Sequence, residues 1–145
     1  MGAAQQGSGV LRSRLVWSAM TAQPAAVEAA LAAAQAAADK QARDIVVLDV
    51  SEQLVITDCF VICSAPNERQ VAAIVNEIEG RLRDLGAKPV RREGEREARW
   101  VLLDFVDVVV HVLHTEERTF YSLERLWKDC PRIEFVDADA RAQGE

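Results

Sequence analysis

The stretch W-V-L-L-D-F-V-D-V-V-V-H-V-L, from Trp100 to Leu113, decides the fold that this sequence predicts. Its alternating pattern around Phe105-Val106 is typical of a β-hairpin with a two-residue loop. That register pairs three sets of residues on one face, namely Asp104 with Asp107, Leu102 with Val109, and Trp100 with His111. The other face is entirely apolar and is expected to pack against the core; it carries Val101, Leu103, Val108, Val110 and Val112.

The mixed face of this hairpin is suited to binding. Two facing carboxylates repel each other, so Asp104 and Asp107 need solvation, a shared proton or a cation. The structural interpretation is that water solvates both carboxylates at the turn. The functional interpretation is that a partner's basic side chain supplies the cation, because a hard metal ion would need more oxygen ligands than the hairpin offers. His111 and His114 lie on opposite faces of a strand, which excludes a zinc-protease motif. We interpret His111 as part of a half-exposed face rather than as a catalyst.

Length and composition indicate one domain. The chain has 145 residues, of which 50% are hydrophobic, so it can bury a core without disulfides or a structural metal. Three cysteines suit a reducing compartment. No segment has the apolar length of a membrane-spanning helix, so no membrane partner is expected. We expect an N-terminal extension over 1–23, a domain over 24–136 and a polar C-terminal tail over 137–145.

The N-terminal extension admits two interpretations. Its lack of acidic residues, together with Arg12 and Arg14, resembles an organellar transit peptide. We favour translation starting at Met20, because two arginines make a thin transit signal. A cytoplasmic location is therefore expected, with an organelle as the alternative.

Charge is unevenly distributed along the chain. The formal net charge of −6 argues against nucleic acid as the main partner. The stretch from Arg81 to Arg99 nevertheless carries seven basic and four acidic residues. The interleaved acidic residues favour a solvated helix end and loop. The alternative is a secondary contact to RNA or another anion through Arg91 and Arg92.

Periodicity predicts an α/β layered domain with a mixed sheet and flanking helices. Asn67 is expected to cap a helix that ends at Gly86, and the same turn offers Ser64 and Arg69 as a weaker anion-binding candidate. Beside the hairpin, the expected elements are a helix over 24–41, strands over 45–50, 54 or 55–63 and 89–92, and a helix over 119–128. The second strand, its following helix and the strand over 89–92 are expected to form a βαβ unit.

Five ordered blocks resemble the ribosomal silencing factor family, also called RsfS or Iojap. They are D-I-V-V-L-D-V-S, T-D-C-F-V-I-C-S-A-P-N-E-R-Q-V, R-R-E-G, W-V-L-L-D-F-V-D-V-V-V-H-V and R-T-F-Y-S-L-E-R-L-W. The resemblance implies a fold similar to that of nucleotidyltransferases, without catalytic residues or a cofactor. It also implies docking on ribosomal protein fourteen of the large subunit, which blocks subunit joining when nutrients are scarce. Many members carry glycine where this chain has Val106, a residue that resists the positive φ of a tight turn.

The expected partner-binding residues are Trp100, Asp104, Asp107, His111, Tyr121 and Trp127. The family pattern also matches Asp58, Arg69 and Gln70. Two other classes of function are the alternatives. A metal-dependent nucleotidyltransferase-like enzyme would need a Gly-Ser turn before an Asp-x-Asp strand, and the chain has only Gly7-Ser8 and Asp137-Ala138-Asp139, in the wrong context. A homodimer formed through the hairpin face is the third hypothesis.

Overall fold

One mixed sheet of six strands organises the chain. A computed structural model describes residues 21–121, 125 and 127–139, apart from the side chains of Phe120 and Tyr121. Its elements are α2 (Pro24–Asp39), β1 (Arg43–Asp49), β2 (Cys59–Ala65), α3 (Glu68–Asp84), β3 (Arg91–Glu93), β4 (Trp100–Asp104), β5 (Val108–His114), α4 (Thr115–Tyr121) and β6 (Arg132–Ile133). The α/β class with a mixed sheet and flanking helices is confirmed.

The strand order is β3-β4-β5-β2-β1-β6. Strands β2 and β5 pair in parallel, whereas the other neighbouring strands pair antiparallel. The predicted β2-α3-β3 unit exists as a crossover, but β4 and β5 lie between its two strands. The parallel pair therefore joins β2 to the second strand of the hairpin, which brings the hairpin to the centre of the sheet.

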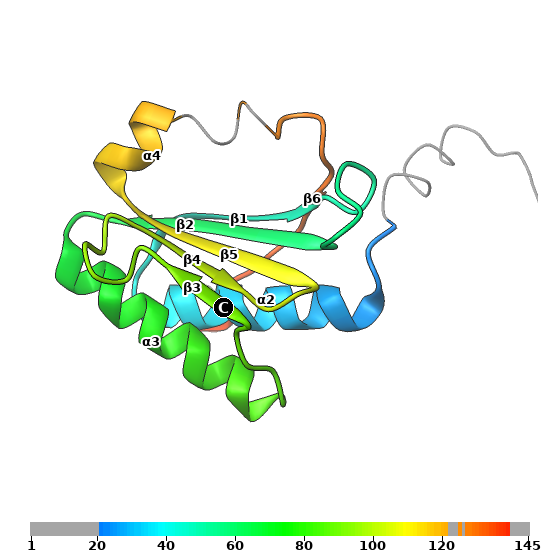
Figure 1. Ribbon diagram of the computed structural model, residues 1–145, viewed down its shortest axis with the longest axis horizontal. Helices are drawn as coiled ribbons and strands as arrows, with labels where there is room; N and C mark the ends of the chain where they lie inside the picture. The colour runs from blue at the N-terminus through cyan, green and yellow to red at the C-terminus, as the bar shows by residue number, and fades with distance from the viewer. Residues whose placement is uncertain (1–20, 122–124, 126, 140–145) are drawn as a thin grey trace, which may run out of the picture.

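Helices α2 and α3 cover one face of the sheet (Figure 1). Six alanines of α2 are buried there, and their small side chains let the helix approach the valines of β2, β4 and β5 closely. The predicted cap of α3 is confirmed, because the Asn67 Oδ1 accepts a hydrogen bond of 2.8 Å from the Gln70 N–H. This side of the sheet is the main hydrophobic core.

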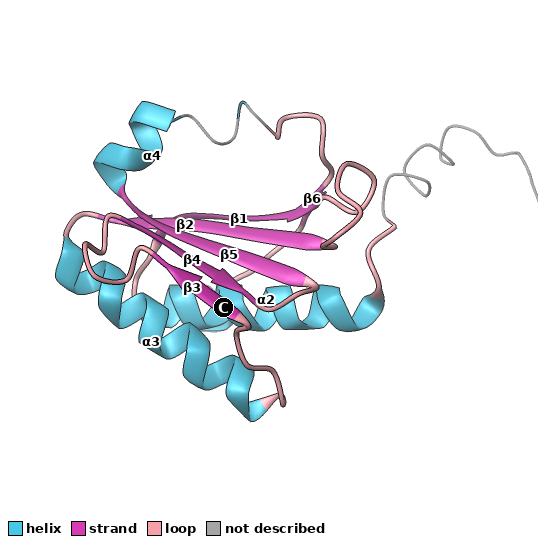
Figure 2. Cartoon of the chain, in the orientation of Figure 1, coloured by secondary structure: helices cyan, strands magenta, loops and turns pink. Residues whose placement is uncertain are grey.

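The opposite face of the sheet is covered less completely. Helix α4 and residues 127–131, which lead into β6, lie on this side (Figure 2). A second, smaller core forms there from β1, β2 and β5 together with Cys130, and the half-buried Trp127 packs against it. The hairpin strands contribute Trp100 and Val109 to the edge of this cluster. We call the hairpin part of this side the outer face; it consists of Trp100, Leu102, Asp104, Val109 and His111.

The starts of two elements differ from the prediction by more than two residues. Strand β2 begins at Cys59, because the Gln53 and Leu54 N–H groups both bond to the Val50 carbonyl and turn the chain away. Val55 and Ile56 are consequently exposed instead of belonging to the strand. Helix α4 begins at Thr115, four residues before the predicted start, and part of its predicted end lies outside the described residues. Within the described residues, no helix has both the length and the apolar character needed to cross a bilayer.

Candidate functional site

The hairpin pairs in a different register from the predicted one. Trp100 lies opposite Leu113, Leu102 opposite His111, and Asp104 opposite Val109. All three predicted pairs are therefore wrong, namely Asp104 with Asp107, Leu102 with Val109, and Trp100 with His111. The strands are displaced by two residues relative to the predicted register, and the turn centres on Val106 and Asp107.

Local hydrogen bonds explain this turn. The Phe105 N–H donates to the Val108 carbonyl at 2.9 Å, and the Asp107 N–H donates to the Phe105 carbonyl at 3.0 Å. The second bond closes a three-residue turn around Val106, whose φ is +77°. The Asp104 Oδ1 accepts from the Val106 N–H at 2.9 Å and thereby holds the turn. A β-branched residue is strained in this conformation.

The two-residue displacement preserves the predicted faces of the strands, because side chains alternate with a period of two. The predicted apolar face is confirmed: Val101, Leu103, Val108, Val110 and Val112 are all at most 2% exposed and belong to the core under α2 and α3. On the outer face, Trp100, Leu102, Asp104 and Val109 are half-buried. The hairpin therefore separates a sealed side from a mixed side, as the sequence predicts.

A chain of aromatic contacts crosses the outer face. The Trp100 Nε1 donates to the His111 Nδ1 at 3.2 Å, which is a diagonal contact between neighbouring strands. The His111 ring meets Phe60 edge-on with ring centroids 4.9 Å apart, and Phe60 meets Trp127 at the same separation. Four rings from three segments far apart in the sequence thus form one cluster.

His111 is the most constrained member of this cluster. Its side chain is 9% exposed, and its Nε2 has no hydrogen-bond partner within the described part of the chain. Burial lowers the pKa of this imidazole to about 4. The ring is therefore neutral at pH 7, and the bond from Trp100 places its proton on Nε2. An uncharged imidazole in this position serves packing and hydrogen bonding.

The two aspartates of the hairpin have different surroundings. Asp104 is half-buried, caps the turn, and lies 3.7 Å from the Arg91 guanidinium. Asp107 is exposed in the turn, and its carbonyl accepts from the Asp58 and Cys59 N–H groups. The counter-charge expected from a partner is thus supplied to Asp104 by Arg91 of the same chain.

The basic stretch is largely paired with acidic residues. Arg92 forms an ion pair with Glu79, and Arg91 lies 3.3 Å from Glu93. Arg99 binds three carboxylates, those of Glu68, Glu116 and Glu117, at 2.8 to 3.0 Å. These contacts favour the interpretation as a solvated, ion-paired surface. Arg69 is exposed in the first turn of α3 and makes no ion pair with the described residues.

Several family-pattern residues have structural contacts. The Asp58 Oδ2 accepts from the Gln23 N–H at 3.0 Å and so holds the chain before α2. The Gln70 Nε2 donates to the carbonyls of Lys40 and Gln41, which connect α2 to β1. Tyr121 is the last residue of α4, and its side chain lies outside the described residues.

The cysteines behave as small core residues. Cys59, Cys63 and Cys130 are all buried and free. Burial raises the pKa of the Cys59 and Cys63 thiols to about 12, so both stay un-ionised at neutral pH. Neither has the thiolate character that nucleophilic or metal-binding cysteines need.

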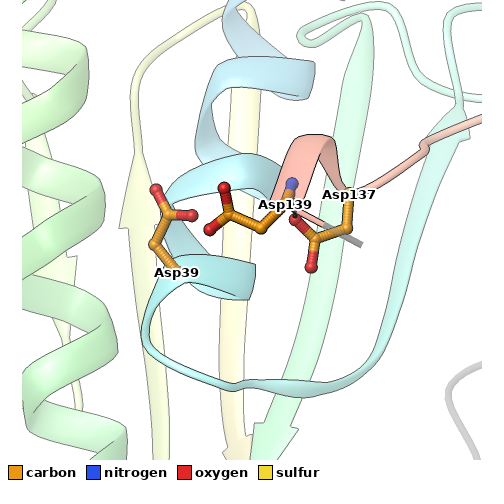
Figure 3. Close-up of side chains that lie close together, drawn as sticks. All are labelled: Asp39, Asp137 and Asp139. Atoms are coloured by element: carbon orange, nitrogen blue, oxygen red, sulfur yellow. Dashed lines mark hydrogen bonds between the residues drawn. The ribbon is translucent and has the colours of Figure 1, made fainter. Parts of the chain in front are cut away.

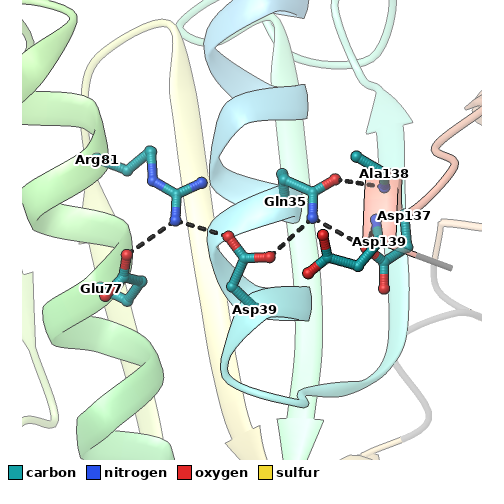
Figure 4. A network of polar contacts seen from close by, with 7 residues as sticks. All are labelled: Gln35, Asp39, Glu77, Arg81, Asp137, Ala138 and Asp139. Atoms are coloured by element: carbon teal, nitrogen blue, oxygen red, sulfur yellow. Dashed lines mark hydrogen bonds and ion pairs between the residues drawn. The ribbon is translucent and has the colours of Figure 1, made fainter. Parts of the chain in front are cut away.

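A carboxylate cluster that the sequence does not reveal joins α2 to the chain after β6. Oxygen atoms of Asp39, Asp137 and Asp139 lie within 4.8 Å of one another (Figure 3). The Gln35 Nε2 donates to both Asp39 and Asp137 at 2.9 Å, and Arg81 bonds to Asp39 at 2.7 Å (Figure 4). Arg81 lowers the pKa of Asp39, so this carboxylate is ionised. These contacts explain the cluster as the attachment of residues 137–139 to α2.

Known proteins match this chain over most of its length. The family model "Ribosomal silencing factor during starvation" matches residues 23–145. The ribosomal silencing factor RsfS of Bacillus subtilis is 46% identical over 99 residues, which are 68% of this chain and 84% of that protein. The chloroplastic protein Iojap of Zea mays is 35% identical over 108 residues, which are 73% of this chain and 46% of that protein.

A solved structure supports the same assignment. The crystal structure of a Chromobacterium violaceum protein matches with a TM-score of 0.68 and 32% sequence identity, covering 76% of this chain and 91% of that one. Sequence similarity and structural similarity therefore agree over most of the chain. The chain belongs to the ribosomal silencing factor (RsfS) family.

Proposed function

We propose that this protein binds the large ribosomal subunit through ribosomal protein fourteen and sterically blocks association with the small subunit. Translation would thereby be repressed when nutrients are limited. The observation that carries the proposal is the aromatic outer face of the hairpin, in a chain that belongs to the RsfS family. Bacterial relatives favour a cytoplasmic site of action, and the chloroplastic relatives support an organelle as the alternative.

The chemistry of the outer face suits a protein partner. Half-buried Trp100 and Trp127 offer large apolar surfaces that cost little conformational entropy when they are fixed in an interface. Leu102 and Val109 extend the apolar area between them, and Asp104 adds a carboxylate at its end. Ribosomal proteins are commonly basic, and an acidic chain of net charge −6 favours association with them over association with RNA.

The roles proposed for individual residues follow from this geometry. Trp100 and Trp127 act as anchors, and His111 holds the Trp100 indole by its hydrogen bond. Asp104 and Asp107 contribute negative charge from two different positions at the turn, and Tyr121 is a further candidate contact. Arg69, Arg91 and Arg92 form the secondary candidate for RNA, although Arg91 and Arg92 already have acidic neighbours.

The test is co-sedimentation of the purified protein with separated ribosomal subunits, followed by light scattering as the subunits are mixed. We expect binding to the large subunit and suppressed joining. Leu102→Lys is expected to abolish both, because it places a charge at the centre of the outer face. Val136→Lys is the control, since Val136 is an exposed aliphatic residue that lies in the chain after β6 and outside the outer face.

Two results would contradict the proposal. The absence of binding to either subunit would reopen the enzyme hypothesis, which nucleotide and magnesium titrations would then address. Dimers that dissociate in Leu102→Lys, without any ribosome binding by the unaltered protein, would identify the outer face as a self-association surface.

A further inference from the structure

A groove of about 370 Å³ lies at the turn end of the hairpin. The first turns of α2, the C-terminal end of α3 and the hairpin turn line it. Ala25, Ala29, Leu85 and Phe105 contribute apolar surface, and the acidic residues Glu28 and Asp107 belong to the same lining. We call this feature the turn-end groove.

The apolar part of the turn-end groove is open to a partner. Leu85 is 53% exposed, and the neighbouring Val106 in the hairpin turn is 51% exposed. The alanines of α2 leave room beside them, because their side chains extend only one carbon from the backbone. An aliphatic chain can therefore lie against the groove and cover surface that is now in water.

The electrostatics of the turn-end groove favour a cation. Glu28 and Asp107 are both exposed, and no basic residue lines the groove within the described part of the chain. Arg83 and Lys88 lie near it in the sequence but are not among the lining residues. The C-terminal end of the 17-residue helix α3 adds the negative end of its dipole. A phosphate group would be repelled by this arrangement.

The different positions of the two hairpin aspartates fit this assignment. Asp104 already contacts Arg91 and the turn backbone, whereas the Asp107 carboxylate has no hydrogen bond or ion pair with the described residues. Asp107 also lines the groove together with residues of α2 and α3, on the side of the sheet opposite the aromatic cluster. Its charge is therefore available to a partner, and Asp104 serves mainly the turn.

We propose that the turn-end groove binds a lysine or arginine side chain of a basic protein on the large ribosomal subunit. The aliphatic part of that side chain lies on Leu85 and Phe105, and its charged end lies beside Glu28 and Asp107. This inference rests on the proposed function and extends the interface from the outer face around the hairpin turn. It adds Glu28 and Leu85, which no sequence motif indicates.

The test measures the affinity of fluorescently labelled protein for purified large subunits over a series of KCl concentrations. Glu28→Gln with Asp107→Asn is expected to bind roughly three- to tenfold more weakly at low salt and to show a shallower salt dependence. Glu97→Gln with Asp139→Asn is the matched control, because both residues are exposed and neither lines the groove. Leu85→Ser is expected to weaken binding without altering the salt dependence. Thermal unfolding verifies that each variant is folded.

The outcomes separate this inference from the proposed function. Large-subunit binding by the unaltered protein, with equal affinity and salt dependence in the groove variant and its control, would overturn the groove and leave the proposed function intact. Failure of the unaltered protein to bind would overturn the proposed function itself. A groove variant that changes only the sedimentation of the free protein would assign the groove to contacts between copies of this chain, which also overturns the inference.

Discussion

The two faces of the hairpin differ in how completely the chain covers them. Val110 and Val109 are neighbours in β5, yet Val110 is fully buried under the helices and Val109 is half-buried on the outer face. Alanine-rich α2 covers the first face, whereas the second has a histidine, a tryptophan and a carboxylate among its aliphatic residues. One strand, β5, therefore supplies both buried residues that stabilise the domain and a surface available for recognition.

The largest effect is expected from aspartate at these neighbouring positions. Val110→Asp should cost more than about 4 kcal/mol of unfolding free energy and prevent folding, because it buries an unpaired charge. Val109→Asp should cost only about 1 kcal/mol, because water reaches the outer face, yet it should lose large-subunit binding. Urea denaturation followed by circular dichroism measures the difference, and equal losses in the two variants would show that the faces are equally buried.

Acid should destabilise the outer face through His111. The folded state holds the pKa of His111 at about 4, below its ordinary value of about 6.5, so only the unfolded chain binds this proton between those pH values. The unfolding free energy should therefore be fully retained above pH 6.5 and fall by about 3 kcal/mol as the pH drops to 4. Urea denaturation between pH 7 and pH 5, where few carboxylates titrate, measures this slope. His111→Gln should reduce the slope, and an unchanged slope would assign the loss to other groups.

A smaller effect is expected in the connection between β3 and β4. Gly94 has φ +82°, and an added Cβ would lie 2.0 Å from the Trp100 carbonyl oxygen. Gly94→Ala should cost about 2 kcal/mol and displace Trp100 from His111. Gly80→Ala is the matched control in α3, because an added Cβ there meets nothing within 4 Å. This variant should gain about 0.5 to 1 kcal/mol of unfolding free energy. Denaturation together with tryptophan fluorescence would measure both effects, and equal stability of the two variants would contradict the prediction.

The smallest effect concerns the turn that joins the two faces. Val106→Gly should raise the unfolding free energy by about 1 kcal/mol, because glycine relieves the positive φ at this exposed position. Val55→Gly is the control, since Val55 is fully exposed but does not have a positive φ, and it should give no gain. Thermal denaturation of both variants measures the change. A lower melting temperature for Val106→Gly would mean that the valine side chain stabilises the turn.

The sequence predicts the faces of the hairpin but not its register. Face assignment depends only on alternation, and a displacement of two residues leaves alternation unchanged. The register depends on the turn, where Val106 adopts a conformation that β-branched residues resist. The run Leu54-Val55-Ile56 was predicted as part of a strand on apolar character, whereas hydrogen bonds to Val50 turn the chain there.

The sequence names Trp127 as a site residue, but it predicts contacts between site residues only within the hairpin. Trp100 and His111 share one face of one hairpin, and they make contact diagonally instead of in the directly opposed pair that the sequence predicts. Phe60 joins them because β2 lies parallel to β5, a long-range arrangement that no local pattern specifies. The contact of Gln35 with Asp137 spans 102 residues, and the turn-end groove combines three separate segments. Such contacts depend on tertiary packing and leave no signature in spacing or periodicity.

The two edge strands of the sheet favour solubility at high concentration. Strand β3 has three residues and β6 has two, so both edge strands are short, and β3 consists of the charged residues Arg91, Arg92 and Glu93. Long, flat, apolar edges invite strand addition between molecules, which leads to open-ended aggregates. Short edges, one of them fully charged, discourage this growth. The sheet can thus carry an aromatic surface on one face while its edge strands resist fibre formation.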